Sequence, residues 1–148
     1  MIAQYVLDHF LADLDAREPR ALELAFALTL TLPQTVLETQ IVPSADATKL
    51  IGADARDLME FARERYDALR DGTFAQVELG NPYIWAFERV GADERLLIVN
   101  NLARVPQPVK FMAYTGRAGW DILNRIEFLF PARVQLEEYE FLWLMLTD

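Results

Sequence analysis

Apolar residues follow a helical spacing in the first half of the chain and the two-residue spacing of strands in the second half. Between residues 54 and 70 they recur every three or four positions, with acidic and basic residues between them, which predicts an amphipathic helix. Gly72 is predicted to end this helix, because glycine tolerates a left-handed backbone. Upstream, residues 20–32 (RALELAFALTLTL) are apolar nearly all the way round, so this predicted helix must be covered on more than one side.

Strand patterns begin with residues 35–42 (TVLETQIV), which are rich in β-branched residues and predict a short strand. After Gly72, YIWAFERV and RLLIVNNL alternate with a period of two around the turn GADE, which predicts a hairpin. Further short strands are predicted in VKFMAY, WDILNRIEFLF, RVQL and EFLWLML. The predicted fold class is α+β, with helices and a short strand in residues 1–72 and an antiparallel β-sandwich in residues 73–148.

Composition and charge narrow the classes of function. With 148 residues, 53% of them hydrophobic, the chain is long enough to bury a core without disulfides or metals, and it has no cysteine. A formal net charge of -9 disfavours nucleic acids and anionic membrane surfaces as partners. The apolar run at residues 21–33 is shorter than the roughly 20 residues that a membrane span needs. Because the N-terminus also lacks a basic signal-peptide region, a cytoplasmic location is expected.

Candidate catalytic and metal-binding residues are few. His9 is the only histidine, and we interpret it as a partly exposed helix residue. The neighbouring acidic residues are interpreted as solvated charges or helix N-terminal charges rather than acid/base pairs; they are Asp13 with Asp15, Asp54 with Asp57, and Glu137 with Glu138. No calcium-loop, zinc-helix or phosphate-loop motif occurs, so no metal or cofactor is predicted.

Aromatic residues are the remaining candidates for ligand contacts. Tyr83, Trp85 and Phe87 share one face of a predicted strand, which favours a place in the core over a sugar-stacking surface. Phe141, Trp143 and Met145 have the same pattern. Trp120 follows TGRAG in a predicted loop, so Trp120 is the tryptophan that could be exposed. We therefore take Trp120 and Tyr114 as candidate carbohydrate-binding residues.

Five phrases in order resemble the end of an alpha-amylase-type glycoside hydrolase, with trehalose synthases and amylosucrase-like members especially similar. They are RALELAFALTLTLP, RDLMEFARERYDALRDGTF, NPYIWAFERVGADERLLIVNNL, WDILN and YEFLWLML. In that family the last helices and strand of a β/α barrel run directly into a C-terminal β-sandwich. The resemblance implies that residues 20–32 correspond to the seventh barrel helix, residues 35–42 to the eighth strand and residues 58–69 to the eighth helix, with the sandwich beginning near Phe74.

The chain also departs from the family pattern. Gln34 stands in LPQTV where the family usually has glycine, and the strand that follows lacks the family's glycine. The family's aspartate nucleophile and glutamate acid lie on barrel strands that this sequence does not contain. Glycoside hydrolysis needs two carboxylates at a fixed separation, so the resemblance implies no catalytic residue within this chain.

Three functional hypotheses follow from this comparison. The first is a non-catalytic, stand-alone remnant with a structural or interaction role, which assembles through its apolar helical half as a homo-oligomer. The second is the tail of a split or truncated α-glucan-active enzyme, completed by a barrel polypeptide. That hypothesis predicts an exposed apolar surface on Leu22, Phe26, Leu28 and Leu30. The third hypothesis is an α-glucan-binding module.

Overall fold

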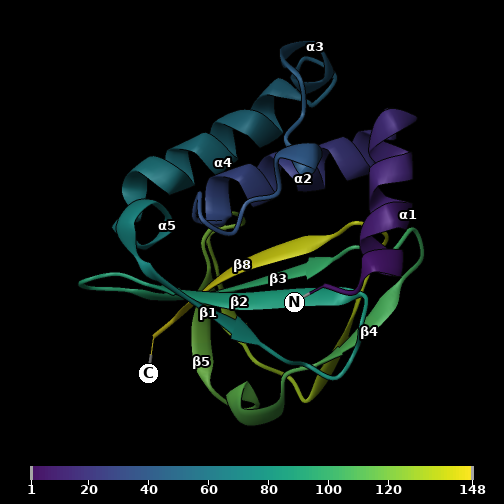
Figure 1. The fold of residues 1–148 in the computed structure, drawn as a ribbon. Coiled ribbons are helices and arrows are strands. Elements are labelled where there is room, and N and C mark those ends of the chain that lie inside the picture. The colour runs from purple at the N-terminus through teal and green to yellow at the C-terminus, as the bar shows by residue number, and fades with distance from the viewer. Residues whose placement is uncertain (1, 148) are drawn as a thin grey trace.

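The fold consists of helices followed by antiparallel strands. A computed structural model describes residues 2–147 of the chain (Figure 1). The α-helices are α1 (Gln4–Asp15), α2 (Pro19–Thr31), α3 (Ala45–Thr48), α4 (Ala53–Arg65) and α5 (Asp67–Asp71). The strands are β1 (Thr73–Val77), β2 (Ile84–Val90), β3 (Arg95–Asn101), β4 (Gln107–Lys110), β5 (Ala118–Asp121), β6 (Ile126–Leu129), β7 (Arg133–Leu136) and β8 (Phe141–Leu146). Two short 3-10 helices are η1 (Thr39–Ile41) and η2 (Met112–Tyr114).

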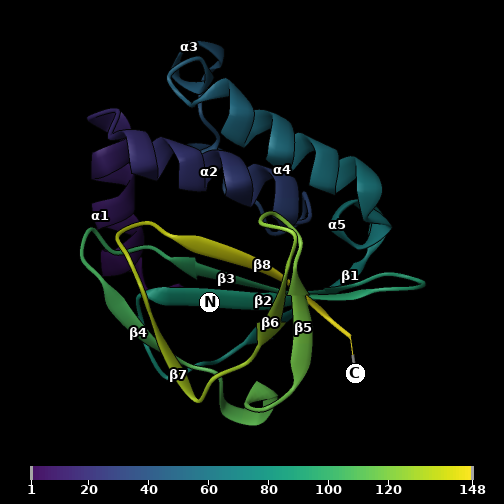
Figure 2. The same ribbon diagram turned by 180° about the vertical axis from the view of Figure 1, so that it is seen from behind.

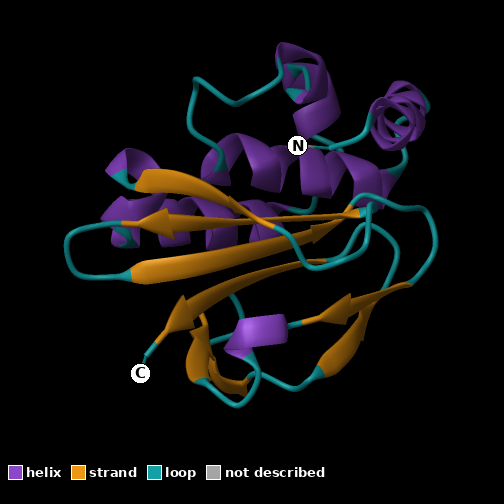
Figure 3. Cartoon of the chain, turned by 60° about the horizontal axis from the view of Figure 1, so that its bottom comes forward, coloured by secondary structure: helices purple, strands orange, loops and turns teal. Residues whose placement is uncertain are grey.

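The strands form one large sheet and one small sheet. The large sheet has the order β1-β2-β3-β8-β5-β6, and β4 pairs with β7 in the small sheet. All of these strand pairs are antiparallel. The helices cover one face of the large sheet and the small sheet lies on its other side (Figures 2 and 3). This arrangement confirms the predicted α+β class with an antiparallel sheet region.

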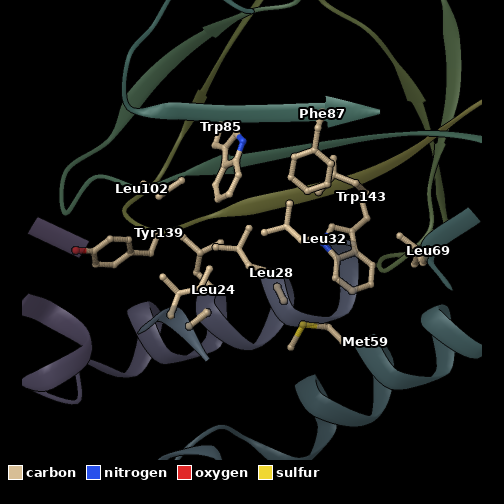
Figure 4. Packing of buried hydrophobic residues seen from close by; sticks show 14 of the residues in the cluster. Leu24, Leu28, Leu32, Met59, Leu69, Trp85, Phe87, Leu102, Tyr139 and Trp143 are labelled. Carbon is tan, nitrogen blue, oxygen red and sulfur yellow. The ribbon is translucent and has the colours of Figure 1, made fainter. Parts of the chain in front are cut away.

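Both faces of the central strands are buried, and their side chains alternate between two apolar clusters. Trp85 and Phe87 of β2 and Trp143 of β8 point to the cluster shared with the helices (Figure 4). Ala86 of β2 and Leu144 of β8 point to the cluster between the two sheets. The two-residue period of the sequence therefore identified the faces correctly.

Helix α2 is enclosed within the chain. It packs against α1, α3, α4 and α5, while Leu24 and Leu28 belong to the cluster shared with the large sheet. Leu22 and Leu28 are 2% and 0% exposed, and Phe26 and Leu30 are half-buried. The exposed apolar surface expected on these residues for a split enzyme is therefore wrong, because the other helices and the sheet cover it.

The predicted strand at residues 35–42 is also wrong. This segment forms turns and the short helix η1, with Ile41 buried in the core. No strand within residues 2–147 lies beside it to accept its backbone hydrogen bonds, and a strand without a neighbour leaves those groups unpaired. The backbone bonds locally instead, since Val36 N and Leu37 N both donate to Pro33 O.

The helix predicted at residues 54–70 is interrupted, and it ends at Gly72 as predicted, but the left-handed backbone predicted for Gly72 is wrong. Tyr66 has φ -114° and ψ 109°, which separates α4 from α5. Gly72 has φ -68°, so the left-handed region is not needed there. Glycine is needed for space, because a Cβ on Gly72 would lie 2.4 Å from Ala68 O and 2.9 Å from Val90 O.

The later predicted strands are shorter than their sequence patterns. Of VKFMAY, only the first two residues lie in β4, and the last three form η2. Met112 has φ 51°, a conformation outside the strand region. WDILNRIEFLF divides into the end of β5, a turn and β6, which is a hairpin rather than one strand.

Arg89 joins the helices to the sheet. Its side chain is 1% exposed and points from β2 toward the ends of α2 and α5. The guanidinium donates to the carbonyl oxygens of Thr31, Gly72 (3.0 Å) and Thr73 (3.3 Å). The carbonyls at the C-terminus of a helix lack helical partners and carry partial negative charge, so a cation is favourable there. Residues 2–72 and residues 73–147 thus share a core and a buried cation.

Candidate functional site

Two hollows lie where α4 approaches the hairpin of β5 and β6. One hollow, which we call the aromatic hollow, has a volume of about 240 Å³ and is lined by Phe61, Ala62, Arg65, Tyr66, Trp120, Ile122 and Arg125. A second one, the α2–α4 cleft, has a volume of about 250 Å³. It is lined by Arg20, Glu23, Ala55, Leu58, Met59, Leu123, Asn124, Tyr139, Glu140 and Phe141.

Asp121 shapes the turn between these two hollows. The Asp121 side chain is buried, and its Oδ1 accepts hydrogen bonds from Leu123 N (3.1 Å) and Asn124 N (3.0 Å). Its Oδ2 accepts from Asn124 Nδ2 (2.9 Å). An aspartate that bonds to backbone groups two and three residues later is typical of a fixed turn. Asp121 therefore holds the turn that separates the aromatic hollow from the α2–α4 cleft.

Trp120 lies in strand β5 rather than in the predicted loop, and it is half-buried. In the aromatic hollow its neighbours include Phe61 and Tyr66. The Arg125 guanidinium lies 5.4 Å from the Phe61 ring centre, and the Arg65 guanidinium lies 5.2 Å from the Tyr66 ring centre. Aromatic faces beside guanidinium donors can pack against apolar ring faces and bond to hydroxyl groups.

Tyr114 lies on the other face of the large sheet. It is 8% exposed and stacks on Phe130 in the cluster between the two sheets. Its hydroxyl donates to Glu88 Oε2, and the same carboxylate accepts two hydrogen bonds from Arg95 at 2.9 and 2.7 Å. The structure therefore does not bring Tyr114 and Trp120 together into one site.

Two buried tyrosine hydroxyls have shifted pKa values. Burial raises the pKa of Tyr114 above the usual 10.0, and its hydrogen bond to Glu88 adds to the effect. The pKa of Tyr139 is raised in the same way, by burial and by its bond to Asp13. For Glu88, burial acts to raise the pKa, but the hydrogen bonds from Arg95 and Tyr114 prevail and lower it.

These shifts predict a loss of stability at alkaline pH. A tyrosine with a raised pKa binds its proton more tightly in the folded state, so its contribution is complete below pH 10.0 and is lost as the pH rises through the folded-state pKa. The double variant Tyr114→Phe/Tyr139→Phe should be less stable than the natural chain at neutral pH, and the difference should shrink above about pH 10. Urea unfolding over this range measures it, with the exposed Tyr5→Phe as control. A difference that stays constant with pH would contradict the assignment.

The other acidic candidates have structural contacts. Asp13 accepts a hydrogen bond from the Tyr139 hydroxyl and lies 3.7 Å from Arg104 Nε. Glu138 Oε1 lies 3.7 Å from Arg20 Nη1. Asp54 and Asp57 line a shallow depression on the exposed side of α4. His9 is an exposed residue of α1, in agreement with the helix position predicted for it.

Across residues 2–147, histidine and carboxylate side chains do not gather in groups of three that could bind a metal ion. None of the helices in the same part of the chain combines the length and apolar character that a membrane span requires.

Comparisons with known proteins lead to alpha-amylase-type enzymes. No family model matches the chain. It is 33% identical to the trehalose synthase of Pimelobacter sp. (strain R48) over an alignment of 103 positions, and the match covers 63% of this chain and 18% of the enzyme. An alpha-amylase from Geobacillus thermoleovorans, solved with acarbose, matches 87% of the chain with a TM-score of 0.63 and 15% identity. An Anoxybacillus alpha-amylase gives 0.61 over the same share at 15% identity.

These findings confirm the resemblance predicted from the five phrases: the chain resembles a portion of an alpha-amylase-family glycoside hydrolase. The two amylase structures, at 15% identity, show a shared fold. The chain spans about a third of each amylase and less than a fifth of the trehalose synthase.

The sequence interpretation missed three residues of the aromatic hollow. Phe61 and Tyr66 are among the apolar positions of the single helix predicted at residues 54–70, but Phe61 is 57% exposed and Tyr66 lies at the end of α4. Arg125 has no distinguishing sequence signal, because it is a single charge in a turn. Its φ of 57° is the one local signal of its special position, and it appears only in the structure.

Proposed function

We propose that this chain is a non-catalytic part of an alpha-amylase-family protein, with a structural or interaction role. The observation that carries the proposal is the enclosure of α2, whose apolar residues pack into a core built by the chain's own helices and sheet. A chain that covers α2 with its own helices and sheet can fold without barrel strands around it. Among the acidic candidates, Asp13 and Glu138 have tyrosine or arginine partners, and Asp54 and Asp57 lie exposed on α4, which supports the same proposal.

An activity assay tests the non-catalytic role. The purified chain should release no more product than a buffer control from maltose, sucrose, trehalose or starch. Both hydrolysis and glycosyl transfer should be measured, because the carboxylate pair of this family can support either reaction. Product above the control, lost after heat unfolding of the chain, would overturn the proposal.

We propose a second function, α-glucan binding, on the specific observation of the aromatic hollow. Trp120, Phe61 and Tyr66 supply ring surfaces there, while Arg65 and Arg125 supply hydrogen-bond donors. Sites for small ligands generally combine an apolar lining with a few polar groups that orient the ligand.

Titration with maltoheptaose tests this second function. Tryptophan fluorescence should change at millimolar sugar or below, because Trp120 is half-buried at the hollow. Trp120→Ala should weaken the affinity by about tenfold, measured by calorimetry since the variant lacks the reporter. Tyr114→Phe is the matched control and should bind normally, since Tyr114 lies on the other side of the sheet. Unchanged fluorescence up to millimolar sugar would contradict binding at this hollow.

A further inference from the structure

One face of α4 is apolar yet exposed. Leu58 is 44% exposed and Phe61 is 57% exposed. Helix α4 is the outermost long helix of the helical layer, beside α2 (Figures 1 and 2). Leu58 and Phe61, together with Asp57, border a shallow depression of about 400 Å³. Single exposed apolar residues are ordinary, but two adjacent ones beside a depression form a surface that another protein can cover.

Charged residues extend this surface at both ends. Asp54 lies in the first turn of α4 and Arg65 in the last, and both are exposed. Residues 54, 58, 61 and 65 are separated by four, three and four positions, which places them in one stripe along the helix. We call Asp54, Leu58, Phe61 and Arg65 the α4 stripe. It has a negative end, an apolar middle and a positive end.

The α4 stripe is complementary to itself when a second copy runs antiparallel to it. Leu58 and Phe61 lie equally far from the midpoint between Met59 and Glu60, and so do Asp54 and Arg65. A two-fold axis at this midpoint therefore places Leu58 against the Phe61 position of the other copy. The same axis places Asp54 against the Arg65 position, and each of these pairs occurs twice. An isologous dimer requires such self-complementarity of one patch.

We propose that the α4 stripe is the contact surface of a homodimer with antiparallel α4 helices. This inference rests on the proposed interaction role and names its partner as a second copy of this chain. Arg65 remains able to pair across the axis while it lies over the Tyr66 ring, because a guanidinium can stack by its face and donate from its edge. Asp57 and Glu64 flank the α4 stripe on one side. In the dimer these carboxylates would repel the same carboxylates of the other copy, so we expect a weak dimer.

Sedimentation velocity at physiological salt tests the dimer. The natural chain should shift from monomer to dimer between about 1 and about 200 µM, the range of a small, weak interface. Phe61→Ser should raise the dissociation constant by at least about tenfold, since it removes two apolar contacts per dimer. A chain that stays monomeric over the whole range overturns the inference, including the case in which it binds some other polypeptide.

Charge exchange tests the two-fold geometry. Asp54→Arg and Arg65→Asp should each weaken the dimer by about tenfold, because each replaces two attractive pairs by two repulsive ones. The double variant Asp54→Arg/Arg65→Asp should return to within about threefold of the natural chain, because the two ends remain opposite in charge. Asp57→Arg is the matched control on the same helix and should not weaken association. A thermal melt of each variant checks that the variant is folded.

The results separate this inference from the proposed function. If the double variant fails to recover while remaining folded, or if Phe61→Ser dimerises normally, the α4 stripe is not the interface. A monomeric chain without glycosidase activity leaves the non-catalytic role intact and overturns the dimer. A dimeric chain with glycosidase activity would support the dimer and overturn the non-catalytic role.

Discussion

Leu28→Ala is expected to lower the free energy of unfolding of the isolated chain by about 3 kcal/mol, within the range for a buried leucine truncated to alanine. Leu28 is 0% exposed and belongs, with Leu24 and Met59, to the cluster between the helices and the large sheet (Figure 4). Its removal deletes apolar contacts and leaves a cavity that the surrounding helices and sheet can fill only in part. Urea unfolding, with the linear dependence on denaturant, measures the difference.

Leu30→Ala is the matched control, because Leu30 lies on the same helix but is half-buried. Its expected cost is about 1 kcal/mol, since less apolar surface is lost from the core. Equal, small effects for the two variants would mean that α2 is not packed in the isolated chain. The apolar face of α2 would then be open to a complementing barrel polypeptide, and the split-enzyme hypothesis would gain the surface that the structure denies it.

Arg89→Met is expected to lower the free energy of unfolding by about 3 kcal/mol, because each buried carbonyl left without a donor costs about 1–3 kcal/mol and the methionine recovers part of the packing. The buried guanidinium bonds to carbonyls of Thr31, Gly72 and Thr73, which lie at the ends of α2 and α5 and the start of β1. Burial also lowers the pKa of Arg89, and neighbouring Arg63 adds to this, so the cation is retained against a desolvation cost.

Arg133→Met is the control for this substitution. Arg133 is exposed on β7, so the same change in side chain should alter stability by no more than about 0.5 kcal/mol. Urea unfolding followed by tryptophan fluorescence measures both variants, because Trp85 and Trp143 lie in the core between helices and sheet. If Arg89→Met were no more destabilising than Arg133→Met, the connection of the helices to the sheet would not depend on this cation.

The sequence determined the features that depend on local periodicity. The alternation in YIWAFERV assigned Trp85 and Phe87 to one face and Ala86 to the other, because side chains of a strand point alternately to its two sides. The apolar residues all round α2 predicted that this helix is covered on several sides, and the structure confirms it. The five phrases also indicated the resemblance to alpha-amylase-type enzymes that the comparisons confirm.

Only the tertiary structure decided features that depend on distant neighbours. Residues 35–42 have strand composition but no strand beside them within the described residues, so their backbone bonds locally. Gly72 is required by the closeness of Ala68 and Val90, which no local pattern reveals.

Tertiary structure also decided where the candidate ligand contacts lie. Trp120 and Tyr114 are six positions apart in the sequence, yet they lie on opposite faces of the large sheet. Phe61 and Trp120 are far apart in the sequence but share the aromatic hollow, because α4 packs beside the hairpin of β5 and β6. A sequence pattern fixes the direction of a side chain relative to its own helix or strand. The packing of these elements then determines which side chains meet.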